Sequence, residues 1–150
     1  MYHSLIYVSR SLLVLPDQAG EIDRIVEGSI ERNAALAVRG ALIFTERHFA
    51  QLLEGPSAAI ETLMDSIERD PRHERVTVIE RRAIEGYRFP DWSLAYWGDA
   101  GYMNLQVARV MEKADALSRS EQTTDLFTLL HALARESHRQ RGPIGRPSRK

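Results

Sequence analysis

The hydrophobic and polar positions of this chain follow two periods, and the change from one to the other marks the expected elements. Short apolar runs rich in β-branched and aromatic residues predict five strands, at residues 5–8, 41–44, 49–53, 76–79 and 92–97. Apolar positions three and four apart predict two helices between them. We expect the first to begin at Pro16-Asp17 and to end near Asn33, and the second to run from Pro56-Ser57 to Asp70-Pro71.

The order β-α-β-β-α-β-β predicts an α+β fold of the ferredoxin-like type, with two helices on one face of a mixed sheet. We expect this domain to occupy residues 1–98, followed by a helical extension over residues 99–140 and a basic, disordered tail over residues 141–150. The extension would cover the second face of the sheet or serve as an interface. Its apolar surface predicts a homo-oligomer, through Leu126, Leu129, Leu130 and Leu133.

Composition excludes several classes of protein. With 150 residues the chain is long enough for a single domain with one core. The net charge of −1 creates no general attraction to nucleic acid or membrane, and no apolar run approaches the roughly 20 residues that span a bilayer. There is no cysteine, which rules out disulfides and thiolate chemistry. Without a basic segment ahead of the first apolar run, we expect no secretory signal and a cytoplasmic protein.

A polar residue inside one apolar run is the main chemical signal. Gln51 lies in a predicted buried strand, where an unpaired amide group would cost about 1–3 kcal/mol. The first and third strands of this fold are central neighbours, so alternation places Tyr7 beside Gln51 under the helices. Ile25 and Ile67 would face each other across that space, with Asn33 above it. Such a slot suits a planar heterocycle with polar edges, although each residue taken alone is also explained by ordinary packing or capping.

Enzyme chemistry is poorly supported, and we expect no enzyme. The five histidines lack a spacing suited to a metal site, and there is no glycine-rich phosphate loop. Nothing in the sequence places Ser9 and His73 together as a nucleophile and its base. The arginine-bearing loop that acylphosphatases of this fold need is not evident.

Five sequence blocks occur in order along the first two-thirds of the chain, and together they resemble the BLUF domain, a blue-light sensor that uses flavin. The blocks are Leu5-Ile6-Tyr7-Val8-Ser9-Arg10, Arg32-Asn33, Phe49-Ala50-Gln51-Leu52-Leu53-Glu54-Gly55-Pro56, Asp70-Pro71-Arg72-His73 and Arg88-Phe89-Pro90-Asp91-Trp92-Ser93-Leu94.

The resemblance implies roles for the residues around the slot. Tyr7 would be the photoactive tyrosine, which gives an electron and then a proton to the excited flavin. Gln51 would bridge Tyr7 and the N5/O4 edge of the ring. Asn33 would hydrogen-bond the carbonyl edge of the ring, and Ile25 and Ile67 would lie on its two sides.

Further residues match the family's pattern or depart from it. Asp70 would lie near the ribityl chain or the ring edge. Trp92 matches a tryptophan that couples the pocket to the C-terminal helices, and Leu94 stands where the family usually has methionine. Arg39 replaces a small residue before the second strand, and Ser66 stands where some members place a basic side chain.

The implied function is a blue-light photoreceptor that holds FAD, or FMN, and signals to a separate downstream protein. The amide of Gln51 can present either its NH₂ or its C=O to one neighbour, by rotation or through its imidic tautomer, so it can hold two hydrogen-bond patterns of similar energy. Light would switch between them. The alternative is a ferredoxin-like interaction module that has lost flavin photochemistry. We expect no metal, no membrane and no nucleic-acid partner.

Overall fold

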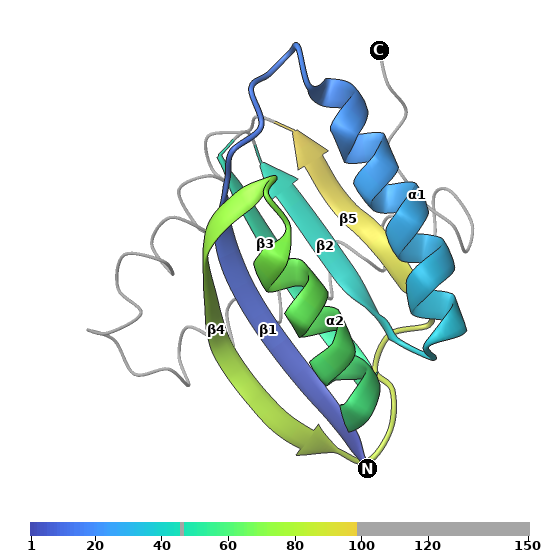
Figure 1. The fold of residues 1–150 in the computed structure, drawn as a ribbon. Coiled ribbons are helices and arrows are strands. Elements are labelled where there is room, and N and C mark those ends of the chain that lie inside the picture. Colours follow the sequence, from blue (N-terminus) through green and yellow to red (C-terminus); the bar gives the residue numbers. More distant parts are fainter. Residues whose placement is uncertain (46, 99–150) are drawn as a thin grey trace.

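The computed structural model describes residues 1–45 and 47–98, which form a curved sheet with two helices (Figure 1). The elements in chain order are β1 (Tyr2–Ser11), α1 (Ala19–Ala35), β2 (Arg39–Thr45), β3 (His48–Pro56), α2 (Ser57–Arg69), β4 (His73–Ile84) and β5 (Trp92–Gly98). This is the predicted order, and the α+β ferredoxin-like fold is confirmed.

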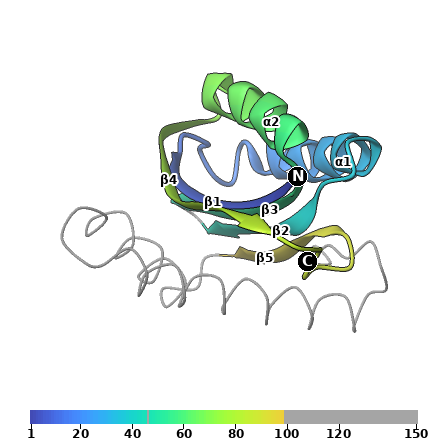
Figure 2. The same ribbon diagram turned by 90° about the horizontal axis from the view of Figure 1, so that it is seen from below.

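The sheet has the strand order β4-β1-β3-β2-β5, so β3 is the central strand and β1 and β2 lie on either side of it. Neighbouring strands are antiparallel except for β2 and β5, which are parallel. Tyr7 pairs directly with Gln51 in the β1–β3 register, and Leu42 of β2 pairs with Gln51 from the other side. Both helices lie on the same face of the sheet, as Figure 2 shows from below.

The core lies between that face and the helices. Alternate residues of the inner strands point into it, and each helix contributes one apolar stripe. The buried members of this core cluster are Leu5, Tyr7, Ile22, Val26, Val38, Leu42, Phe44, Phe49, Leu53, Ile60, Leu63, Met64 and Trp92. The predicted faces of β1 and β3 are therefore correct.

The element bounds differ from the sequence prediction in ways that backbone pairing explains. Helix α1 begins at Ala19 instead of Pro16-Asp17, because Val14 and Gln18 close a turn ahead of it: Gln18 N donates to Val14 O at 2.8 Å, and Val14 N donates to Gln18 Oε1 at 2.7 Å. Strands β1 and β4 run well beyond their apolar runs, since they pair with each other as far as Ser11 and His73.

The turn into β2 depends on one glycine. Gly40 has a φ of 143°, and a Cβ there would lie 1.9 Å from the carbonyl oxygen of Leu52. Only glycine therefore lets β2 approach β3 this closely. Gly40 N also donates to Asp91 O at 3.0 Å, which holds the start of β5 beside β2.

The proposed helical extension and basic tail, residues 99–140 and 141–150, lie outside the described residues. Neither helix in the described part of the chain is long and apolar enough to cross a membrane.

Candidate functional site

A cavity lies between the two helices and the inner strands. Its walls come from α1, the three strands β1, β2 and β3, the end of α2 and the segment that follows it. The lining residues are Tyr7, Arg24, Ile25, Gly28, Ser29, Arg32, Leu42, Phe49, Gln51, Ser66, Ile67, Asp70, Arg72 and His73.

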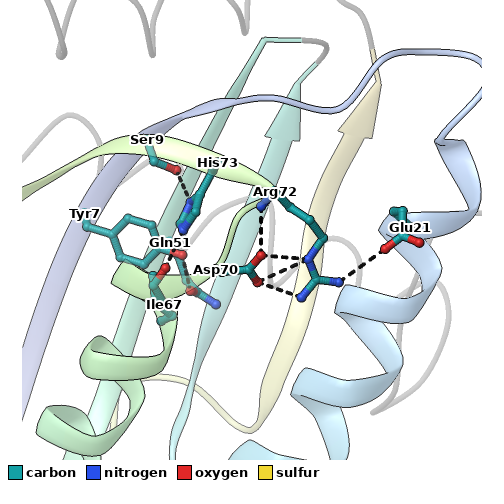
Figure 3. Close-up of polar contacts among 8 residues, drawn as sticks. All are labelled: Tyr7, Ser9, Glu21, Gln51, Ile67, Asp70, Arg72 and His73. Atoms are coloured by element: carbon teal, nitrogen blue, oxygen red, sulfur yellow. Dashed lines mark hydrogen bonds and ion pairs between the residues drawn. The ribbon is translucent and has the colours of Figure 1, made fainter.

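Tyr7 and Gln51 form a hydrogen bond at the floor of this cavity. The hydroxyl of Tyr7 donates to Gln51 Oε1 at 2.7 Å, and both side chains are at least 95% buried (Figure 3). Burial, with a smaller contribution from the charge of Asp70, raises the pKa of the Tyr7 hydroxyl, and the charge of Arg32 only partly opposes this. The phenol is therefore a protonated donor at neutral pH. The bond to Oε1 turns the amide nitrogen of Gln51 away from Tyr7.

A string of charged groups lies at the end of α2. Asp70 follows the last residue of this helix, and its carboxylate accepts from Arg72 N and Nε at 2.9 Å and from Arg72 Nη2 at 2.6 Å. Burial alone would raise the pKa of Asp70, but the hydrogen bonds and charge of Arg72 outweigh it and lower that pKa. Arg72 also reaches Glu21 of α1, with Nη1 3.6 Å from Oε2 (Figure 3). These contacts connect the two helices beside the cavity.

Ser9 and His73 are in contact, although the sequence gave no reason to place them together. Ser9 Oγ lies 2.7 Å from His73 Nδ1, and His73 Nε2 lies 2.6 Å from the carbonyl oxygen of Ile67. The geometry does not support a nucleophile and its base, because Ser9 is fully buried and the second ring nitrogen faces a carbonyl instead of an orienting carboxylate.

The structure brings most of the predicted site residues together. Tyr7, Ile25, Gln51, Ile67 and Asp70 all line the cavity, with Ile25 and Ile67 contributed by different helices. Their proposed roles remain predictions.

Among the described side chains, those of Asn33 and Trp92 do not line it. Asn33 is buried near the end of α1, and its Oδ1 accepts no hydrogen bond from the described part of the chain. Trp92 begins β5 and packs in the core, and its indole Nε1 likewise has no partner among the described residues. Leu94 pairs with Leu42 through the β2–β5 ladder.

The two substitutions noted in the sequence have different positions. Ser66 lines the cavity, as expected for a residue near the cofactor. Arg39 does not line it: its guanidinium lies 3.9 Å from the centroid of the Tyr87 ring, and Nη1 donates to Phe89 O at 3.4 Å. Arg39 therefore acts on the connection between β4 and β5, not on the pocket rim.

Sequence reasoning assigned no role to several lining residues. Ser29 and Arg32 follow Ile25 at positions i+4 and i+7, so the helical period would have placed them on the same face. Arg72 and His73 directly follow Asp70-Pro71 within one of the recognised blocks. Gly28, at position i+3 from Ile25, lies on the same face by the same period, whereas Arg24 had no such signal.

The donor set fits a flat heterocycle with polar edges. Ile25 and Ile67 supply apolar walls, and Gln51 supplies an amide at the cavity floor. The Oδ1 of Asn33 is buried without a partner among the described residues, although Asn33 does not line the cavity. A Cβ placed on Gly28 would meet nothing within 4 Å, so this part of α1 leaves room for a ligand. Among the described residues no group of three or more His, Asp or Glu could hold a metal ion.

Fold and site thus define a ferredoxin-like domain with a buried tyrosine–glutamine pair at the floor of a cavity between the sheet and its two helices. The family model described as "BLUF: Sensors of blue-light using FAD" matches residues 2–95. The chain belongs to the BLUF family.

Individual relatives agree with this assignment. The chain is 32% identical over 92 residues to the photoactivated adenylate cyclase subunit beta of Euglena longa, covering 61% of this chain and 10% of that protein. It is 32% identical over 117 residues to the blue light- and temperature-regulated antirepressor BluF of Escherichia coli K12, covering 78% of this chain and 26% of that protein. It therefore spans only about a tenth to a quarter of these relatives.

A solved structure covers more of the fold. The dark-state structure of BlrB, described as a BLUF protein, superimposes with a TM-score of 0.68 at 30% identity. The match covers 87% of this chain and 96% of that one.

Proposed function

We propose that this chain is a blue-light photoreceptor in which Tyr7 and Gln51 form the switch and a flavin lies between α1 and α2. The observation that carries the proposal is the 2.7 Å hydrogen bond between these two buried side chains at the floor of the cavity. In a cavity wall, a tyrosine paired only with a neutral amide is available for electron and proton transfer.

Bound flavin supplies the absorption of blue light and, once excited, an acceptor for an electron and a proton. With flavin bound, Tyr7 would be the electron donor, and its Oη proton would leave along the existing hydrogen bond toward Gln51 Oε1. The amide of Gln51 would then change to its second hydrogen-bond pattern, with its NH₂ available to the carbonyl edge of the ring. A hydrogen bond gained at that edge would shift the absorption to the red.

The remaining cavity residues hold the ring in this proposal. Ile25 and Ile67 enclose it from the two helices, Asn33 binds its carbonyl edge, and Asp70 lies toward the ribityl chain. Asn33 does not line the cavity. Its buried Oδ1 has no donor among the described residues, and it could accept from a ring N–H while Nδ2 donates to the carbonyl edge.

FAD is the flavin we propose, and FMN is the competing one. Three arginines line the cavity, namely Arg24, Arg32 and Arg72. Cationic side chains suit the phosphate groups that both flavins carry, because guanidinium groups bind phosphate in a bidentate manner. The second phosphate of FAD would use more of this positive charge than the single phosphate of FMN.

The signal would leave through β5, with Trp92 and Leu94 as output residues, toward a separate downstream protein in the cytoplasm. Trp92 supports this route because its buried indole N–H has no acceptor among the described residues, so it can gain a partner when the structure changes. The leucine pattern beyond residue 98 supports self-association.

Absorption spectroscopy of the purified protein tests the function. We expect a yellow preparation whose blue absorption band shifts reversibly to the red on illumination, and loss of that shift in Tyr7→Phe and Gln51→Leu. Leu12→Ala, an exposed position outside the cavity, is the control and should keep it. A full red shift in either site variant overturns the mechanism, and a colourless protein that cannot be reconstituted with FAD or FMN overturns the function.

A further inference from the structure

His73 forms a tether that the proposed photochemistry does not use. Its half-buried imidazole bonds at both nitrogens, to Ser9 of β1 and to the carbonyl of Ile67 near the end of α2 (Figure 3). His73 itself is the first residue of β4. One side chain therefore joins three elements.

The chemistry of the partners fixes the ring. A carbonyl oxygen can only accept, so His73 Nε2 carries a hydrogen and donates to Ile67. In the neutral imidazole the other nitrogen, Nδ1, is then an acceptor and receives the hydroxyl hydrogen of Ser9. The two bonds select one tautomer.

The bond from His73 reaches the C-terminal end of α2, where backbone carbonyls have no partner within the helix. Ile67 lies in the last turn of α2, and the last four carbonyls of a helix have no partner within the helix. Ile67 O accepts from Asp70 N at 3.2 Å and from His73 at 2.6 Å. The shorter bond comes from outside the helix, so the position of this turn is set by His73.

The ring also contacts the floor of the cavity. It lies edge-on to Tyr7, with centroids 6.3 Å apart and planes at 72°, and edge-on to Phe49 at 5.7 Å and 87°. Edge-to-face contacts of this kind favour one orientation over sliding. Ile67, which lines the cavity from α2, is thereby held at a fixed distance from Tyr7 on β1.

We propose that His73 is a positioning residue for the flavin site: with Ser9 it holds the last turn of α2 against β1 and so sets the spacing between the Ile67 wall and the Tyr7–Gln51 pair. The inference rests on the proposed function only in taking the ligand of this cavity to be a flavin. Without these two hydrogen bonds, the last turn of α2 can move relative to β1. This movement weakens flavin binding and changes the rate at which the illuminated form returns to the dark form.

A set of matched variants separates the two bonds. His73→Leu keeps side-chain bulk but loses both bonds, Ser9→Ala loses only the bond at Nδ1, and His73→Gln restores an N–H donor that can reach Ile67 O. For each lost hydrogen bond we expect flavin dissociation to be about fivefold faster. The expected order is therefore His73→Leu fastest, with Ser9→Ala and His73→Gln, which both keep a donor to Ile67 O, slower and similar to each other. Recovery of the dark spectrum after illumination should change in the same order.

Two measurements need no light response and keep a failure of this inference distinct from a failure of the photoreceptor function. Nitrogen-15 NMR of the imidazole in the flavin-loaded protein should show His73 with its hydrogen on Nε2. Amide hydrogen exchange over residues 66–70 should speed up in His73→Leu and much less in His73→Gln. An Nδ1–H tautomer, or unchanged exchange and flavin dissociation in His73→Leu, overturns the tether even if the red shift is normal. A normal tether in a protein without a red shift counts against the photochemistry alone.

Discussion

Strand β3 carries two buried polar side chains three residues apart, and they are held in opposite ways. Gln51 points toward the helices and the cavity, and its hydrogen bond to Tyr7 joins two neutral groups. Glu54 is paired with Ser4 in the β1 register and, by strand alternation, lies on the other face.

Glu54 is surrounded by donors. Its Oε1 accepts from Arg88 N at 2.6 Å and from Phe89 N at 2.7 Å, and its Oε2 lies 3.3 Å from Arg88 Nε. Arg88 in turn donates to Ser4 Oγ at 2.7 Å. The carboxylate is fully buried and fixes the connection between β4 and β5 to the middle of the sheet.

The difference shows how one strand can combine an anchor with a switch. A charged group with several partners has one favourable arrangement, because any movement leaves a buried charge or N–H unpaired. A neutral amide with one strong partner and a cavity beside it has alternatives of similar energy. The four changes below test this contrast, beginning with the largest expected effect.

Removing the anchor should cost the most stability. Glu54→Ala removes the carboxylate that accepts from two backbone N–H groups and lies beside Arg88 Nε, and we expect a loss of about 3 kcal/mol in the free energy of unfolding. Urea denaturation measures it. Glu61→Ala removes an exposed carboxylate from α2 and should change stability by no more than about 0.5 kcal/mol. Equal losses of unfolding free energy in the two variants would contradict the role of Glu54 as an anchor.

Breaking the switch pair should cost less, and the cost should depend on both partners. Tyr7→Phe leaves Gln51 Oε1 without its donor, for an expected loss of about 1–2 kcal/mol. In the double variant Tyr7→Phe/Gln51→Leu both polar groups are gone, so its loss should be smaller than the sum of the two single losses. Urea denaturation at one saturating flavin concentration provides the double-mutant cycle. Strict additivity would show that the two side chains do not act as a pair.

Filling the cavity from α1 should affect the ligand more than the fold. Gly28 lines the cavity, and no atom lies within 4 Å of a Cβ built there. Gly28→Ala should therefore stabilise the helix by about 0.5–1 kcal/mol. Gly28→Leu should remain folded but bind little flavin, measured by the ratio of flavin to protein absorbance. Gly20→Leu makes the same change in α1 away from the cavity, and a similar flavin loss there would argue against this location.

The smallest expected effect is the pH dependence of Asp70. Its pKa is lower in the folded protein than in the unfolded chain, so its ionised form contributes stability above the unfolded value of about 4. That contribution is lost as the pH falls through the folded pKa. The difference in thermal midpoint between wild type and Asp70→Asn should therefore be constant from about pH 5 to 7 and shrink below about pH 4. A difference in thermal midpoint that stays constant down to pH 2 would contradict the role of Arg72 as the partner of Asp70.

Periodicity and alternation predicted the parts of the fold that depend on single elements. The core face of β1 and β3 and the adjacency of Tyr7 and Gln51 followed from a period of two and from the strand order of this fold. The end of α2 at Asp70-Pro71 followed from the proline. The lengths of β1 and β4 did not, since they depend on backbone pairing between strands far apart in the sequence.

The sequence also did not predict side-chain contacts between segments that are far apart in the chain. Ser9 and His73 are 64 positions apart, and neither has a local pattern that names its partner. The sequence marked Arg39 only as a departure from the family pattern before the second strand, whereas its side chain extends to Tyr87 and Phe89 across the β4–β5 connection. Long polar side chains reach several residues from their backbone, so strand position alone does not locate their charged ends.

The strand order has a consequence for how the molecule opens. Tyr7 and Gln51 lie on β1 and β3, which are both inner strands of the sheet, and β3 is its central strand. Inner strands exchange their amide hydrogens only in openings close to global unfolding, while edge strands and helix ends open at a lower free energy. The proposed rearrangement between Tyr7 and Gln51 would therefore take place in the part of the domain that opens last. The strain it creates cannot be relieved by local melting around the pair, and we expect the peripheral elements to be the ones that yield.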